Sequence, residues 1–223
     1  MPVVSLLQLD TSFPRIAGDI GSPDTWRADL DIHVVPDLSV ARVINKDPGD
    51  TDMSGVEAAM ASARGDLLTT SCGFLCYWQD RLAAAAEAPF VSSALLALPD
   101  LMDRFAREEL AILTFDSDVL ASPAFAPSLH GFDGRIVGLH QDSHLRQVIA
   151  RDLPDLDRHR AEDEILRLVD GLCASAGVRA LLLECTNLPP YKQALKARFG
   201  IEVFDILTLI NQMNPDIVDS AFL

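Results

Sequence analysis

The chain has 223 residues, of which 49% are hydrophobic, and its formal net charge is −15. A surface this acidic repels phosphate backbones, which excludes nucleic acid as an expected partner but leaves room for a small anionic substrate in a local pocket. No apolar run approaches the roughly 20 residues of a membrane span, and no secretory pattern opens the sequence. Since the four cysteines make no disulfide framework, we expect a cytoplasmic protein with no membrane partner.

The first half of the sequence alternates apolar runs with turn signals and helix-type segments. The expected extended segments are 2–9, 32–35, 40–44, 67–70 and 89–93. The expected helices are 52–63, 73–86 and 95–109, and the expected turn is 47–50. Residues 13–25 carry several Gly and Pro turn signals, so they predict a long loop directly after the first strand, where functional loops of α/β folds lie.

The second half of the sequence repeats the plan of the first. Residues 180–187 (ALLLECTN) match 67–74 (LLTTSCGF) at an offset of 113 positions, which is 185 minus 72. Each copy is an apolar run that ends near a cysteine, the pattern of a parallel strand that opens into a helix. Residues 110–117 likewise echo residues 4–11. The further expected elements are a strand at 136–139, an amphipathic helix at 157–176 and a helix stop at Gly177.

Strands that alternate with helices, duplicated along the chain, predict an α/β fold of two similar lobes related by pseudo-twofold symmetry. We expect each lobe to be a mostly parallel sheet flanked by helices, with an active site in the cleft between the lobes. The expected boundaries place lobe 1 at 1–105 and lobe 2 at 106–204, with 205–223 packing back on lobe 1.

Cys72 and Cys185 are the candidate catalytic residues. Inversion of a carbon acid is simplest with two bases on opposite faces, and two facing lobes that each offer one thiol supply that geometry. Thiol and thiolate are both accessible near neutral pH, since the ordinary pKa is about 8.5, and a helix N-terminus favours the thiolate. A single cysteine at a strand end is usually a small core residue, but two at matched positions of a repeat favour an acid–base pair.

The expected substrate-binding residues follow strand ends or lie in the loop after the first strand. Arg15 is the only cation of that loop and is a candidate partner for a carboxylate, with a solvated surface arginine as the alternative. Backbone N–H groups after each cysteine are expected to face a carboxylate or a developing enediolate charge. The other candidates, several of which can instead cap helices, are Asp10, Thr70, Gly73, Phe74, Ser92, Ser93, Asp116, Ser117, Thr186 and Asn187.

Neither a metal nor a nucleotide cofactor is expected. His140 and His144 have i, i+4 spacing, but no His-Glu-x-x-His pattern accompanies them, and the sequence has no phosphate-binding glycine motif. We expect Cys76 and Cys173 to lie in the core and to be inert.

Two segments carry a family resemblance. Glu-Cys-Thr-Asn-Leu-Pro-Pro-Tyr at 184–191 and Thr-Ser-Cys-Gly-Phe at 70–74 resemble the two cysteine motifs of the aspartate/glutamate racemase superfamily, which includes hydantoin racemases, maleate isomerases and arylmalonate decarboxylases. The resemblance implies a two-lobed, cofactor-independent enzyme with Cys72 and Cys185 as opposed acid and base. Glutamate racemases carry Asn-Thr after the first cysteine and His after the second Cys-Thr. This chain departs from them at both places, so glutamate is not the expected substrate.

The loop 13–23, together with Cys72-Gly73-Phe74, resembles the branch that contains the algal dimethylsulfoniopropionate lyases. Three functions therefore stay open. The first is a racemase or epimerase that acts α to the carboxylate of an amino acid or related small carboxylate. The second is a lyase that follows the same proton abstraction with β-elimination, and the third is a non-catalytic small-molecule binding protein. A homodimer is the default expectation for the assembly.

Overall fold

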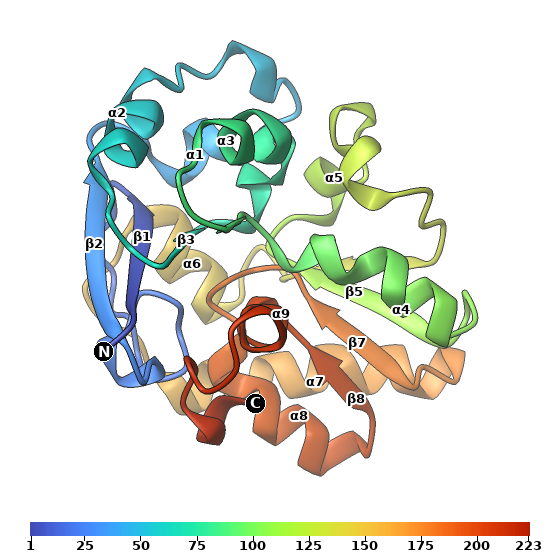
Figure 1. Ribbon diagram of the computed structural model, residues 1–223. Coiled ribbons are helices and arrows are strands. Elements are labelled where there is room, and N and C mark those ends of the chain that lie inside the picture. Colours follow the sequence, from blue (N-terminus) through green and yellow to red (C-terminus); the bar gives the residue numbers. More distant parts are fainter.

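The computed structural model describes residues 1–223, apart from the side chains at 175 and 176. Two four-stranded sheets lie on different sides of the molecule (Figure 1). The first sheet contains β1 (Val3–Leu9), β2 (Asp29–Val35), β3 (Leu67–Thr70) and β4 (Phe90–Val91). The second sheet contains β5 (Leu110–Thr114), β6 (Arg135–Gly138), β7 (Ala180–Leu183) and β8 (Glu202–Phe204).

The two sheets repeat one topology. The strand orders are β2-β1-β3-β4 and β6-β5-β7-β8, and every pairing is parallel. Because parallel strands are covered on both faces, all four residues of β3 and of β7 are buried, including the polar Thr69 and Thr70. The predicted α/β fold with two similar lobes is confirmed.

Helices flank both sheets (Figure 1). They are α1 (Val40–Val43), α2 (Ser54–Ser62), α3 (Gln79–Ala85), α4 (Leu98–Arg104), α5 (Ser117–Leu120), α6 (His144–Arg151), α7 (Arg158–Ala176), α8 (Lys192–Phe199) and α9 (Ile206–Met213). Capping residues determine where several of these helices begin and end. The Asp157 side chain accepts a hydrogen bond at the start of α7, and Gly177 at φ 64° ends that helix in the left-handed conformation, as predicted.

Three of the predicted elements are wrong in part. Val40–Val43 is one helical turn instead of an extended segment, because packing of buried Val40 and Val43 overrides the modest helix preference of valine. The segment Gly73–Trp78 after Cys72 is a 3₁₀ helix, and the α-helix begins only at Gln79. The helix predicted to reach residue 109 ends at Arg104, where Phe105 turns extended.

The C-terminal residues contact the segment between β1 and β2 and the helix α8. Val218 forms an antiparallel bridge with Trp26, and the N–H of Arg27 donates to the carbonyl of Ile217 at 2.9 Å. The buried ammonium of Lys192 in α8 donates to the carbonyl of Phe222 at 3.2 Å. The lobe boundaries at 105 and 204 stay predictions. None of the helices in the described part of the chain is both long and apolar enough to cross a bilayer.

Candidate active site

A small cavity lies where the carboxyl ends of the inner strands of both sheets meet. Its volume is about 20 Å³, close to the space that one water molecule needs. Its walls come from the loop after β1, the segments after β3, β5 and β7, and helices α1 and α6. The lining residues are Leu9, Thr11, Phe13, Arg15, Val40, Ile44, Ser71, Cys72, Gly73, Phe74, Phe115, Ile149, Glu184, Cys185, Thr186 and Asn187.

Cys72 reaches this cavity from the first lobe. It follows β3 and occupies the N-cap position of the 3₁₀ helix, where its carbonyl accepts a hydrogen bond from the N–H of Leu75 at 3.1 Å and the N–H groups of Phe74 and Leu75 act on its sulfur to lower the pKa. Burial raises the pKa of the Cys72 thiol to about 12, and the charge of Glu184 adds to the rise, against the effects of these N–H groups and of Arg15. In the closed cavity Cys72 is therefore a thiol at neutral pH.

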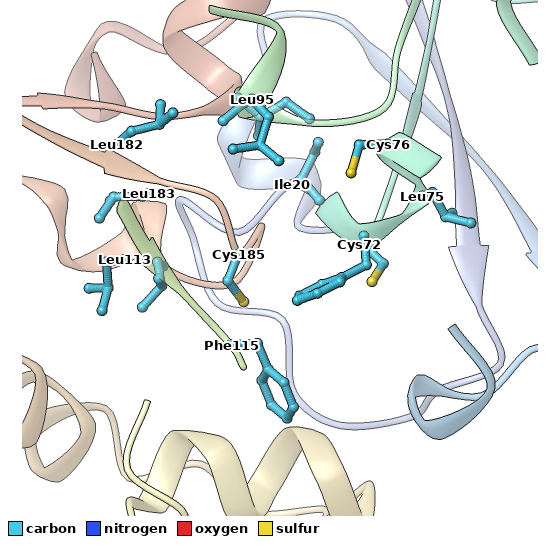
Figure 2. Close-up of a cluster of buried hydrophobic side chains, with 14 of the residues drawn as sticks. Ile20, Cys72, Leu75, Cys76, Leu95, Leu113, Phe115, Leu182, Leu183 and Cys185 are labelled. Carbon is cyan, nitrogen blue, oxygen red and sulfur yellow. The ribbon is translucent and has the colours of Figure 1, made fainter. Parts of the chain in front are cut away.

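Cys185 reaches the same cavity from the second lobe, and Figure 2 shows its side chain between Phe115 and Cys72. Its thiol donates to Oδ1 of Asn187 at 3.6 Å. Burial, followed by the charge of Glu184, raises the pKa of Cys185 well above its ordinary value, and Asp19 and Cys72 add to the rise. The backbone N–H of Asn187 opposes this rise, but no cation near Cys185 does so as Arg15 does near Cys72.

A polar network joins the loop after β1 to the second cysteine motif. Arg15 pairs with Asp19 at 3.1 Å, and its second nitrogen donates to Thr11 at 3.2 Å. The amide nitrogen of Asn187 donates to the other oxygen of Asp19 at 2.6 Å. Because that nitrogen is engaged, the carbonyl oxygen of the Asn187 amide faces Cys185 as an acceptor. One carboxylate, Asp19, therefore orients both the cation and the amide of the site.

Glu184, directly before Cys185, is completely buried. Its Oε2 accepts a hydrogen bond from Thr114 at 2.6 Å, and its Oε1 has no partner among the described residues. Burial raises the pKa of this carboxyl to about 7, against the lowering effect of the Thr114 hydrogen bond. A Cβ on Gly73 would lie 2.2 Å from Oε1 and 2.5 Å from the carbonyl oxygen of Glu184, so only glycine lets the two lobes approach here.

Two further contacts close the lobes over the cavity. The Thr186 hydroxyl donates to the carbonyl of Ser71 at 2.6 Å, which ties the two cysteine motifs together. At the end of α6, the Asp152 carboxylate accepts hydrogen bonds from the N–H of Ser12 at 2.7 Å, its hydroxyl at 2.9 Å and the N–H of Phe13 at 2.8 Å. Both contacts join residues that are far apart in the sequence.

The structure brings together seven of the residues singled out in the sequence. Those that line the cavity are Arg15, Cys72, Gly73, Phe74, Cys185, Thr186 and Asn187. The six that do not line it are Asp10, Thr70, Ser92, Ser93, Asp116 and Ser117. Thr70 lies behind the site, where its hydroxyl interacts with the carbonyls of Cys72 at 3.0 Å and Ser92 at 2.9 Å.

Local hydrogen bonds to backbone N–H groups occupy Asp10, Ser93 and Asp116, and the buried hydroxyl of Ser92 has no partner among the described residues. Asp10 accepts from the N–H of Asp37 at 3.0 Å, and Ser93 caps the 3₁₀ turn that follows it. Asp116 caps α5, at whose first position Ser117 lies, and it pairs with Arg146 at 2.5 Å. For Ser93 and Asp116 this is the helix-capping role that the sequence also allowed.

Several lining residues were not singled out in the sequence. Glu184 had a visible signal, since an acid that ends an apolar strand run must either be exposed or carry a raised pKa. Phe13, Phe115 and Ile149 had none, because their approach to the cavity depends on how the lobes pack. No group of His, Cys, Asp and Glu among the described residues is arranged to hold a metal ion.

The similarity to known proteins agrees with this geometry. No family model matches the chain. Dimethylsulfoniopropionate lyase 3 of Emiliania huxleyi is 28% identical over 98% of this chain, and the chain spans 61% of that relative's length. Among solved structures, the allantoin racemase of Klebsiella pneumoniae superposes with a TM-score of 0.64 at 16% identity and covers 96% of this chain and 86% of its own.

The aspartate racemase of Picrophilus torridus superposes with a TM-score of 0.59 at 15% identity, over 100% of this chain and 98% of its own. At such identities the superpositions report the fold alone. The chain therefore has the fold of the aspartate and allantoin racemases together with a sequence similar to the dimethylsulfoniopropionate lyases, which confirms the resemblance carried by its two cysteine motifs.

Proposed function

We propose that this chain is an enzyme that removes the proton α to a carboxylate and needs no cofactor, with Cys72 and Cys185 as base and acid. One observation carries the proposal: two thiols from equivalent positions of duplicated lobes line a single cavity. A planar carbanion between them can lose a proton to one sulfur and regain one from the other. Hydrogen-bond donors after each cysteine are suited to the enediolate charge that develops.

The surroundings of the two sulfurs indicate which thiol acts first as base. Two backbone N–H groups near the Cys72 sulfur and the nearby charge of Arg15 favour its thiolate. The Cys185 thiol donates to Asn187 and faces Glu184 and Asp19, and only the backbone N–H of Asn187 favours its thiolate. Cys72 then takes the α-proton, and Cys185 supplies a proton to the opposite face. The first candidate outcome is racemisation or epimerisation of a small carboxylate.

Elimination is the second candidate outcome, and two observations favour it. The sequence relative named above is a dimethylsulfoniopropionate lyase. The cavity is lined by Phe13, Phe74 and Phe115, of which Phe13 and Phe115 already lie against Arg15 and Arg146. The ring of Phe74 suits a soft alkylated cation that has no N–H to satisfy, whereas an ammonium brings three donors. In that reaction Cys72 takes the α-proton, the C–H electrons form the carbon–carbon double bond, and the β-carbon–sulfur bond breaks with its electron pair on the departing sulfide.

Product analysis on the purified protein tests the proposal. The probes are dimethylsulfoniopropionate, with dimethyl sulfide followed in the headspace and acrylate in solution, and single enantiomers of amino acids, hydantoins and 2-aryl carboxylates, followed by chiral chromatography. We expect one probe class to turn over and Cys72→Ser to abolish that turnover. Tight binding of a carboxylate without turnover or α-proton exchange would contradict the proposal and leave a binding protein.

A further inference from the structure

The Glu184 carboxyl lies in the candidate active site without a counter-charge. It is fully buried, the neutral hydroxyl of Thr114 is its one hydrogen-bond partner among the described residues, and its Oε1 remains unpartnered against Gly73. An ionised carboxylate in such surroundings loses its hydration without gaining an ion pair. The arrangement therefore suits a carboxyl that exchanges a proton.

The titratable groups that face Glu184 are themselves acids. Cys72 and Cys76 come from the 3₁₀ helix after β3, and Cys185 is its neighbour in the chain. Arg15, the cation that lines the cavity, is paired with Asp19 at 3.1 Å. A charge on Glu184 would raise the pKa of all three thiols, so the carboxyl and the thiols compete to be the group that ionises.

We propose that Glu184 is the proton-holding residue of this site: Cys72, Cys185 and Glu184 share one negative charge, and either thiol is ionised only while the Glu184 carboxyl holds a proton. The inference rests on the proposed acid–base role of the two thiols. Moving the charge from oxygen to sulfur breaks one S–H bond, forms one O–H bond and leaves the total charge unchanged. Glu184 is thus a positioning residue that acts through the thiols.

Thiolate absorbance in the ultraviolet tests the shared charge without any substrate. The parent protein carries Cys76→Ser and Cys173→Ser, so that Cys72 and Cys185 give the signal. Glu184→Gln keeps the shape and an acceptor for Thr114 but never ionises. We expect it to lower the pH midpoint of thiolate formation by about one unit or more, since a like charge is removed. Glu108→Gln, the same change at an exposed position, should leave the midpoint unchanged.

The pH–rate profile gives a second readout with a different signature. If the three acids share one charge, the rate with any processed substrate rises with pH up to the pKa of the carboxyl, about 7, and then levels off. In Glu184→Gln the rate should continue to rise above that pH, because only thiol ionisation limits it. A residue with a purely structural role would change the height of the profile and leave its shape unaltered.

Equal pH midpoints of thiolate formation in the parent and in Glu184→Gln would overturn the inference. Because this measurement needs no activity, a failure of the inference is distinct from a failure of the proposed function. If Glu184→Gln does not fold, Thr114→Val replaces it. Loss of the hydrogen bond from Thr114, which lowers the pKa of Glu184, should move the infrared band of the protonated carboxyl to a higher pH midpoint. An unmoved midpoint would also overturn the inference.

Discussion

Cys72 and Cys185 occupy matched positions of the repeat, yet their surroundings differ. The N–H groups of Phe74 and Leu75 and the guanidinium of Arg15 oppose the rise in the pKa of Cys72 that burial causes. For Cys185 the nearby charges, Glu184 and Asp19, are negative. A duplicated fold thus supplies two equivalent sulfur positions, and a few neighbouring side chains give them different proton affinities.

Alkylation with iodoacetamide, followed by peptide mass spectrometry, measures this difference. We expect Cys72 to be labelled faster than Cys185, because the thiolate is the reactive form. Arg15→Gln should reduce the ratio of the two rates by about tenfold, the effect of a one-unit change in the pKa of Cys72. Arg27→Gln, at a half-exposed arginine paired with Asp219, is the control. Faster labelling of Cys185 in the wild-type protein would contradict the assignment of Cys72 as base.

Gly73 is a second residue whose role depends on the meeting of the lobes. A methyl group there would overlap Oε1 and the carbonyl oxygen of Glu184, so we expect Gly73→Ala to lower the free energy of unfolding by about 1–3 kcal/mol, as overpacking does, and to reduce activity. In Gly171→Ala the new Cβ meets nothing within 4 Å. That change should be neutral or stabilise by up to about 1 kcal/mol. Urea unfolding distinguishes the two, and equal stabilities would contradict the close approach.

At the scale of elements, α6 covers the cavity and is tied to the opposite lobe. Asp152, at φ 49°, ends this helix and accepts three hydrogen bonds from Ser12 and Phe13. Burial by itself raises the pKa of Asp152. These hydrogen bonds and the charge of Arg15 together lower the pKa by more than burial raises it, so the net shift is downward. The contact therefore persists above the ordinary carboxyl pKa and is lost only as the pH falls through the lowered value.

Asp152→Gly removes the carboxylate without straining the left-handed backbone. We expect about 1–3 kcal/mol of destabilisation, the range of lost hydrogen bonds to a charged group, and faster alkylation of both cavity thiols. Asp216→Gly makes the same change at another aspartate with positive φ, 69°, and should leave the thiols as slow as in the wild type. Unchanged alkylation in Asp152→Gly would show that α6 does not limit access to the site.

The elements also show what a sequence can and cannot predict here. The strands and the two cysteine positions were predictable, because the apolar runs at 67–70 and 180–183 repeat at a fixed offset and buried parallel strands have few alternatives. The helix Val40–Val43 was not predictable, since tertiary packing decided its conformation against local preference. Phe115 and Ile149 reach the cavity through the same kind of long-range packing.

At the scale of the whole molecule, the cavity between the lobes holds about 20 Å³ in this closed arrangement. A carboxylate substrate of five or more heavy atoms exceeds that volume, so the lobes or the elements that cover the cavity must separate for it to enter. Closure then removes water from around the sulfurs, which strengthens the electrostatic interactions that the reaction uses. The contacts of Asp152, Thr186 and Asn187 across the lobes are among those that opening has to break.

The fate of the α-proton in deuterium oxide tests the two-thiol account most directly. With a substrate identified from the probe classes above, the wild-type protein should incorporate solvent deuterium at the α-carbon of an enantiomer product, whereas elimination removes the α-proton without replacing it. If the product is an enantiomer, Cys72→Ser and Cys185→Ser should each lower its formation by about a hundredfold or more, the usual contribution of a positioned acid or base. Full turnover in either variant would remove that cysteine from the mechanism and contradict the account.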